Sequence, residues 1–159
     1  MAIVEDADSF TGVGESLKRH WTLHRVEINA GVSEEELNAF EVKHRVVLPH
    51  DMRSYFSCVN GMPLDVVDEA LIRFWTLNEM KPLTEGAPAY SDPRYIQRPK
   101  SIFLFADYSI WAHAYAIRLE SIPLQANEVC IIGGDRPSTI AHSFSELVDR
   151  YLTNKELLH

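Results

Sequence analysis

The chain contains seven histidines, the side chains best suited to holding a metal ion or transferring a proton near neutral pH. His20 and His24 are four residues apart, so on a helix both rings would lie on one face, with the spacing found in zinc proteases. The glutamate that makes that zinc motif catalytic is absent, because Trp21 stands in its place. Other histidines are isolated in the sequence: His44, His50, His113 and His142. We therefore predict structural or solvent-exposed histidines, no metal site and no cofactor.

The two cysteines raise a second possibility, nucleophilic catalysis by a thiolate. Cys58 would need a base such as His113 or His142, which only the fold could bring to it. Both Cys58 and Cys130 lie in apolar runs, where buried and inert thiols are the common state, and two cysteines are too few for a disulfide framework. We predict reduced, buried thiols. A cysteine- or carboxylate-dependent hydrolase is the least favoured of three functional hypotheses, and the favoured ones are not enzymes.

A cluster of acids and a pair of glycines complete the residues that could do chemistry. Asp65, Asp68 and Glu69 could form a carboxylate site for acid/base catalysis or for a cation, but a solvated loop is the simpler interpretation. Gly133-Gly134 follows a predicted strand, as in phosphate-binding loops, yet the fuller phosphate motifs are missing and Asp135 would repel phosphate. We predict a turn there and no catalytic residue.

The helices that would position these side chains are marked by their ends. Leu48-Pro49 predicts the start of a helix, and Asn60-Gly61 predicts a left-handed stop. Ser33 and Glu36 form a capping-box pattern at the start of another helix, and Ser143 with Glu146 repeats it near the C-terminus. A further helix is predicted within residues 9–24, where Leu17, Trp21 and His24 are spaced to share a face.

Strand-forming segments follow the predicted stop at Gly61. Alternation and β-branched or aromatic content predict four strands, at Ala70–Leu77, Ile102–Ala106, Trp111–Leu119 and Glu128–Ile132. Four prolines in Lys81–Lys100 predict a long loop. In the third strand large residues alternate with alanines, so we expect helices to pack closely on the alanine face. That arrangement would leave Trp111, His113 and Tyr115 under the loop or on an open surface.

Composition agrees with a single α+β domain spanning residues 1–159: N-terminal helices, a central antiparallel sheet of about four or more strands, and a C-terminal helix. With 46% apolar residues, the chain can bury one core without disulfides or metals. Its acidic N-terminus does not look like a secretory signal, and no apolar run has membrane-spanning length, so we expect a soluble cytoplasmic protein. The net charge of −8 disfavours nucleic acid as a partner and favours basic partners.

Four motifs in a fixed order resemble the SUKH superfamily, which groups a fungal cell-wall-synthesis regulator with bacterial relatives, many of them toxin-immunity proteins. The resemblance covers residues 33–152 and rests on Glu41 before Leu48-Pro49, Tyr55-Phe56 leading to Asn60-Gly61, the segment Ile72–Glu79, and Ile140–Phe144. Glu41 is either a buried acceptor for backbone N–H groups near the corner or an exposed acid, and we favour the structural role. The family has glycines after Ala106-Asp107, whereas this chain has Tyr108-Ser109-Ile110-Trp111.

The resemblance implies a non-enzymatic immunity protein that binds and occludes a cognate toxin. An acidic protein would suit a basic toxin such as a nuclease. The alternative is an intracellular regulatory or scaffold module that binds a protein or a small ligand, for which a pocket beneath the Lys81–Lys100 loop would be the sign. The composition of the chain suggests a partner-binding patch of acids and aromatic residues: Asp65, Asp68, Glu69, Trp75, Asp107, Tyr108 and Trp111. The sequence identifies neither the toxin nor the oligomeric state.

Overall fold

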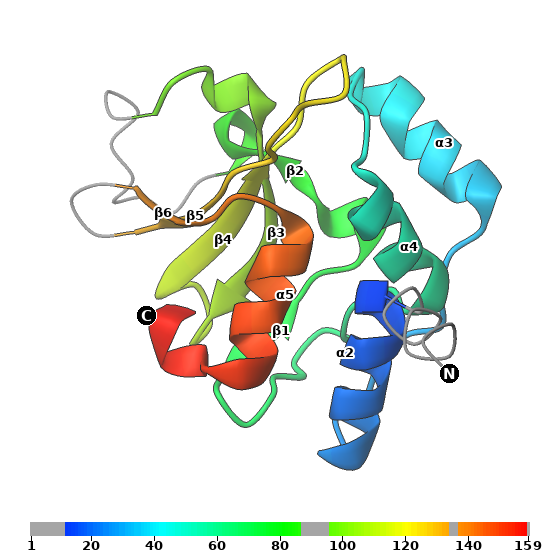
Figure 1. The fold of residues 1–159 in the computed structure, drawn as a ribbon, viewed down its shortest axis with the longest axis vertical. Coiled ribbons are helices and arrows are strands. Elements are labelled where there is room, and N and C mark those ends of the chain that lie inside the picture. The colour runs from blue at the N-terminus through cyan, green and yellow to red at the C-terminus, as the bar shows by residue number, and fades with distance from the viewer. Residues whose placement is uncertain (1–11, 87–95, 134–136, 159) are drawn as a thin grey trace, which may run out of the picture.

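In the part of the chain that the structure describes, four α-helices and one six-stranded antiparallel sheet form an α+β domain, as predicted (Figure 1). A computed structural model describes residues 12–86, 96–133 and 137–158. The helices are α2 (Gly12–Leu23), α3 (Glu34–His44), α4 (His50–Cys58) and α5 (Phe144–Thr153). The strands are β1 (Ile72–Phe74), β2 (Lys81–Pro82), β3 (Ile102–Tyr108), β4 (His113–Arg118), β5 (Val129–Ile132) and β6 (Ser138–Ala141).

The capping residues place two helices where the sequence predicts them. Before α3, the Ser33 hydroxyl accepts the Glu36 N–H at 3.2 Å, and the Glu36 carboxylate accepts the Ser33 N–H at 2.8 Å. Before α5, the Ser143 hydroxyl likewise accepts the Glu146 N–H at 3.0 Å. Glu146 completes this second cap differently, because it accepts the N–H of His142 rather than that of Ser143.

The corner between α3 and α4 is held by Glu41. Its carboxylate accepts the Leu48 N–H at 2.7 Å and pairs with Arg53 at 3.0 Å. Of the two interpretations given to this acid, the backbone acceptor is therefore the one observed. Helix α4 starts directly after Pro49, as predicted.

The predicted stop at Asn60-Gly61 is wrong in detail. Helix α4 ends at Cys58, and Val59 is already extended and bridges to Ala30. Gly61 does have a positive φ of 62°, but it serves a close crossing instead, since a Cβ there would lie 2.4 Å from the Trp75 carbonyl oxygen. The glycine thus allows the chain to pass against the end of β1.

The sheet has the order β1-β3-β4-β5-β6, and β2 also pairs with β3. Strand β1 is shorter than predicted, because Thr76 caps a 3-10 turn over Leu77–Glu79. Strands β3, β4 and β5 lie close to their predicted positions. Strand β2 falls inside the predicted long loop, and β6 was not predicted at all.

The prediction for the two faces of β4 is wrong. Tyr115 and Ile117 pack in the main core, together with buried residues of the helices α2, α4 and α5. The alanine face, Ala114 and Ala116, instead lies in a second buried cluster with Trp75, Leu83, Ile102, Leu104 and Ile132. The physical reason is size, because the bulky indole of Trp75 needs small residues opposite it, while the larger β4 side chains gain most from burial under helices.

Helices α2, α4 and α5 contact one another, and α5 lies across the sheet (Figure 1). Within the ranges that the structure describes, every helix is too short or too polar to cross a lipid bilayer.

Candidate functional site

The carboxylate of Asp107 organises the end of the sheet where β1 and β3 meet. Trp75 Nε1 donates a hydrogen bond to Asp107 Oδ2 at 2.6 Å, and both side chains are buried. The other carboxylate oxygen accepts the backbone N–H of Trp111 at 3.3 Å. Because a buried carboxylate must be compensated by donors, Asp107 fixes both tryptophans relative to β3.

A partly buried ion pair between Arg73 and Glu79 also supports this end of the sheet. Arg73 donates to both carboxylate oxygens of Glu79, at 2.9 and 2.7 Å, and to the carbonyl oxygens of Met62 and Pro63. Burial favours a higher pKa for Glu79, but hydrogen bonds from Arg73 and Thr76 outweigh it and lower the pKa. The guanidinium thereby holds the 62–64 segment against β1.

The turn between β3 and β4 is strained. Ser109, Ile110 and Trp111 have φ values of 49°, 52° and 70°, a left-handed conformation that costs non-glycine residues about 1–3 kcal/mol each. The Ser109 N–H is bonded to the Leu71 carbonyl at 2.8 Å, which anchors the turn to the segment before β1. The turn thus presents an isoleucine that is 85% exposed and a tryptophan that is 36% exposed.

A cleft of about 280 Å³ opens beside this turn, and its lining residues are Leu64, Arg73, Trp75, Glu79, Lys81 and Trp111. The Trp111 ring lies 4.9 Å from the Trp75 ring between centroids, and Lys81 Nζ is 5.7 Å from the Trp111 ring centroid. Exposed apolar side chains flank the cleft at Leu64 and Ile110. We call Leu64, Leu71, Ile110 and Trp111, with this cleft, the Trp111 surface.

The structure divides the predicted patch between two places. Trp75, Asp107 and Trp111 meet at the Trp111 surface, where the first two are buried supports. Tyr108 stacks on His113 and packs against the main core. Asp65 is exposed in the turn after Leu64.

The other two acids of the predicted patch lie near the C-terminal end of α5. Asp68 is buried, against the prediction of a solvated loop, and accepts the N–H groups of Ala70 and Ile72 as well as the hydroxyl of Tyr151. Glu69 is exposed and pairs with Lys155. The prediction of a solvated loop holds for the exposed Asp65 and Glu69 and fails for Asp68, because α5 places Tyr151 against Asp68 from far along the chain.

Sequence reasoning missed six members of the Trp111 surface: Leu64, Leu71, Arg73, Glu79, Lys81 and Ile110. One signal was present for Glu79, since Thr76-x-x-Glu79 is a capping-box pattern, and the structure forms both of its bonds. A second signal, for Ile110, was the absence of glycine from Tyr108-Ser109-Ile110-Trp111. Without glycine, the turn after the strand had to be either longer or strained.

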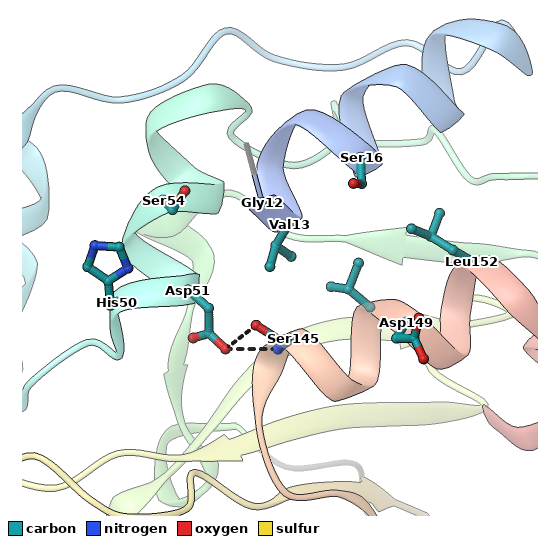
Figure 2. Close-up of a pocket in the computed structure, with 10 residues that line it drawn as sticks. Gly12, Val13, Ser16, His50, Asp51, Ser54, Ser145, Asp149 and Leu152 are labelled. Carbon is teal, nitrogen blue, oxygen red and sulfur yellow. Dashed lines mark hydrogen bonds between the residues drawn. The ribbon is translucent and has the colours of Figure 1, made fainter. Parts of the chain in front are cut away.

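A larger cleft of about 430 Å³ lies between α2, α4 and α5 and borders Gly12, the first residue that the structure describes (Figure 2). Within it, the Asp51 carboxylate accepts both the N–H and the hydroxyl of Ser145 at 2.8 Å, as the dashed lines show. Asp51 thus satisfies the first turn of α5, where a carboxylate is also favoured by the helix dipole. This role is structural.

A third cleft, of about 250 Å³, lies on the alanine side of the sheet beside the predicted loop. Its lining includes Arg118, Glu128 and Thr139 as well as Ile96 and Ile102. An apolar pocket here would favour the regulatory alternative, but the lining of this cleft is partly polar.

The thiols are not set up as nucleophiles. Cys58 Sγ lies 3.3 Å from Glu15 Oε1, and burial followed by this carboxylate raises the pKa of the thiol. Burial also raises the pKa of Cys130 to about 11. A nucleophilic cysteine needs the opposite change, a lowered pKa beside a base or a cation.

A scan against protein-family models found no matching family, and no curated protein shows significant similarity to this sequence.

Proposed function

We propose that this protein is a non-enzymatic immunity protein, which binds a cognate toxin in the cytoplasm and blocks it by occlusion. The observation that carries the proposal is the β3–β4 turn, where three successive non-glycine residues adopt left-handed backbone and leave Ile110 and Trp111 at the surface. Stability alone would favour glycine or asparagine at such positions. A strained turn that holds apolar side chains at the surface is consistent with a binding role, because backbone strain is often kept at functional sites.

The surroundings of this turn fit the anatomy of a protein-binding hot spot. Trp111 is backed by buried Trp75, so a partner would meet a rigid aromatic anchor rather than a mobile one. Apolar Leu64 and Leu71 are exposed nearby, and the charged groups of Glu79 and Lys81 border the cleft. Tryptophan centres with polar rims are typical of tight protein interfaces.

The negative net charge of this protein favours a basic toxin, such as a nuclease, as the partner. The net charge of −8 would attract a positively charged domain over distance and speed its association at low salt. The resemblance of residues 33–152 to the SUKH superfamily adds the expectation of an immunity role. Occlusion requires no catalytic group on this protein, which agrees with the raised pKa values of both thiols.

The alternative function is a regulatory or scaffold module of the cell-wall-regulator type, which binds a protein or a small ligand. The cleft beside Arg118 favours it, because a cationic side chain next to Ile96 and Ile102 could hold a small anionic ligand. Mass spectrometry of the native protein would reveal such a co-purified ligand.

The test uses a toxin encoded next to this gene, expressed as its isolated effector domain. Isothermal titration should give tight binding that Trp111→Ala and Ile110→Asp each weaken by at least about 30-fold. Val42→Asp is the matched control for Ile110→Asp, because Val42 is nearly as exposed as Ile110 but lies on α3. Co-expression should rescue cells from the toxin. Failure of rescue would contradict the immunity role, and unchanged affinity in both variants would contradict the surface.

A further inference from the structure

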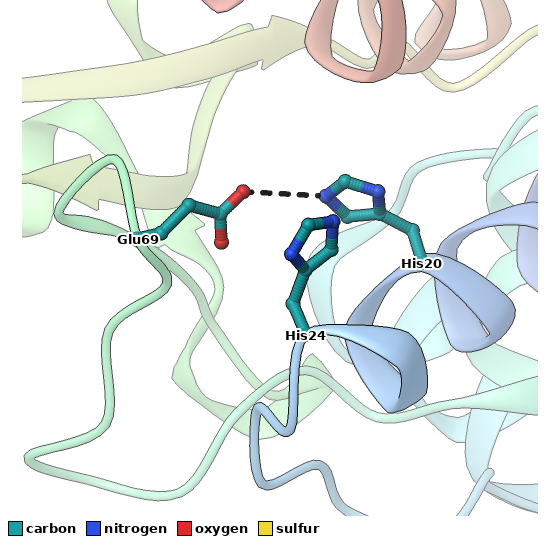
Figure 3. A group of neighbouring side chains, drawn as sticks. All are labelled: His20, His24 and Glu69. Atoms are coloured by element: carbon teal, nitrogen blue, oxygen red, sulfur yellow. Dashed lines mark ion pairs between the residues drawn. The ribbon is translucent and has the colours of Figure 1, made fainter.

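Three side chains of types that can ligate a metal, two histidines at the end of α2 and a glutamate from the segment before β1, lie close together (Figure 3). His20 lies in the last turn of the helix, and the His24 N–H bonds to the His20 carbonyl at 3.1 Å, so the helical spacing continues to His24. The two ring centroids are 4.3 Å apart. Glu69 approaches from the segment before β1, and one ligand atom from each residue lies within 4.8 Å of the others.

We propose that His20, His24 and Glu69 bind a divalent transition-metal ion, Zn²⁺ in the first instance. Tetrahedral zinc has bond lengths of about 2.0–2.2 Å, which place neighbouring ligand atoms about 3.4 Å apart. His20 Nε2 and Glu69 Oε1 are 3.5 Å apart, so this pair already has the required separation. His24 is exposed and can adjust its ring to complete the set. Two imidazoles and a carboxylate suit zinc better than magnesium or calcium.

A positive charge already occupies this position. Lys155 Nζ lies 3.3 Å from His20 Nε2 and 3.3 Å from Asp68 Oδ2, and it donates a hydrogen bond to Glu69. An ammonium group held by a carboxylate and an imidazole marks a point of negative potential, strengthened by the C-terminal end of the α2 dipole. A metal ion would displace the flexible lysine, leaving two carboxylates to balance its charge.

The groups behind the site are rigid. Asp68 accepts the hydroxyl of Tyr151, which in turn accepts the Nε1 hydrogen of Trp21 at 2.7 Å. This chain of buried bonds fixes α2, α5 and the segment carrying Glu69 relative to one another. Because His24 and Glu69 are exposed, solvent could reach a bound ion and supply a water molecule as its fourth ligand.

Neither spacing nor composition could reveal this site, because Glu69 is distant from the histidines in sequence and Trp21 breaks the known zinc motif. The sequence pattern therefore predicts no metal site. The proposal does not depend on the immunity function, since it involves a different part of the surface.

Titration of the full-length, tag-free protein with ZnCl₂ should show one ion per chain. At about 100 times the Kd, Zn²⁺ should raise the Tm by about 5–10 °C. Co²⁺ in place of Zn²⁺ should give the visible absorption of a four-coordinate site. An absence of stoichiometric binding, or a Tm that does not respond, would overturn the proposal.

Two variants separate this site from adventitious binding. His24→Gln should weaken Zn²⁺ binding by on the order of 100-fold or more, whereas His142→Gln, another exposed histidine outside the site, should leave it unchanged. Lys155→Met should tighten binding at least about tenfold, because the competing ammonium is gone. Equal affinities in the two histidine variants, or no gain in Lys155→Met, would contradict the assigned ligands.

Discussion

Trp75 and Asp107 are joined by a hydrogen bond of 2.6 Å between two side chains that are only 3% and 5% exposed. Their burial changes the role that composition suggested for them, which was direct contact with a partner. Asp107 instead supports the indole of Trp75 and the backbone of Trp111, so in the proposed function these residues would contribute to binding only by positioning the exposed turn.

Asp107→Ala should therefore destabilise the protein as well as weaken binding. The change leaves the Trp75 Nε1 hydrogen without its partner in a buried place, which costs about 1–3 kcal/mol of the free energy of unfolding. Urea unfolding followed by tryptophan fluorescence measures this loss. Glu27→Ala, which removes an exposed acid at a residue with ordinary backbone, should stay within about 0.5 kcal/mol of the wild type. Equal stability of the two variants would show that the bond contributes nothing.

The strained turn predicts that a substitution which relieves the strain raises stability and weakens the proposed binding. Ile110→Gly should raise the free energy of unfolding by about 1 kcal/mol, because glycine adopts the φ of 52° without a Cβ clash. The same change should weaken toxin binding, since the exposed side chain is lost. Ile122→Gly is the matched control: Ile122 is also exposed but has no positive φ, so this variant should not gain stability. A less stable Ile110→Gly protein would argue against strain.

The ion pair between Arg73 and Glu79 predicts an acid-dependent loss of stability. The pKa of Glu79 is lowered in the folded protein, although burial opposes the effect of Arg73, so its contribution is present above the unfolded value of 4.5. That contribution is lost as the pH falls through the lower folded value. The stability difference between wild type and Glu79→Gln should be largest near pH 7 and shrink below pH 4.5. Urea unfolding of both proteins across this range measures the difference.

The close crossing at Gly61 predicts that adding a side chain there causes a steric clash. A glycine that only ended a helix would not have this effect. Gly61→Ala places a Cβ 2.4 Å from the Trp75 carbonyl oxygen at a positive φ, so we expect a loss of about 2 kcal/mol or more in the free energy of unfolding. Gly86→Ala is the control, because its new Cβ would meet the flexible end of Lys81, which can move aside. Thermal unfolding of both proteins would decide, and a Tm for Gly61→Ala equal to that of Gly86→Ala would contradict the crossing.

Local signals explain what the sequence could predict. The caps at Ser33 and Ser143 and the start at Pro49 each depend on residues within one helical turn, so α3, α4 and α5 were placed correctly at their starts. The α+β class followed from the order of these elements. Strands β3, β4 and β5 were also recognisable, because each lies in a run of several residues that alternate in side-chain character or are rich in β-branched and aromatic side chains.

The errors concern contacts between distant residues. Asp68 is buried because Tyr151, far away in the sequence, packs against it. Which face of β4 lies in which core depends on the positions of Trp75 and Leu83. A local sequence pattern contains no information on either contact. The candidate sites share this property. The Trp111 surface joins segments before β1 and after β3, which only the pairing of these two strands brings together.

The raised pKa values of the two thiols predict slow alkylation. The activated thiol of a cysteine hydrolase would react quickly instead. With its pKa raised by burial to about 11, Cys130 is only about 0.1% thiolate at pH 8 and should react with iodoacetamide far more slowly than a free cysteine. Cys58 is more accessible but lies beside Glu15, so Cys130→Ser isolates it for measurement. Adding Glu15→Gln should then speed its alkylation, because burial and this carboxylate both raise the pKa of Cys58. Mass spectrometry over time gives both rates. A Cys58 that reacts faster than free cysteine, and that slows in Glu15→Gln, would indicate an activated nucleophile and argue for the hydrolase instead.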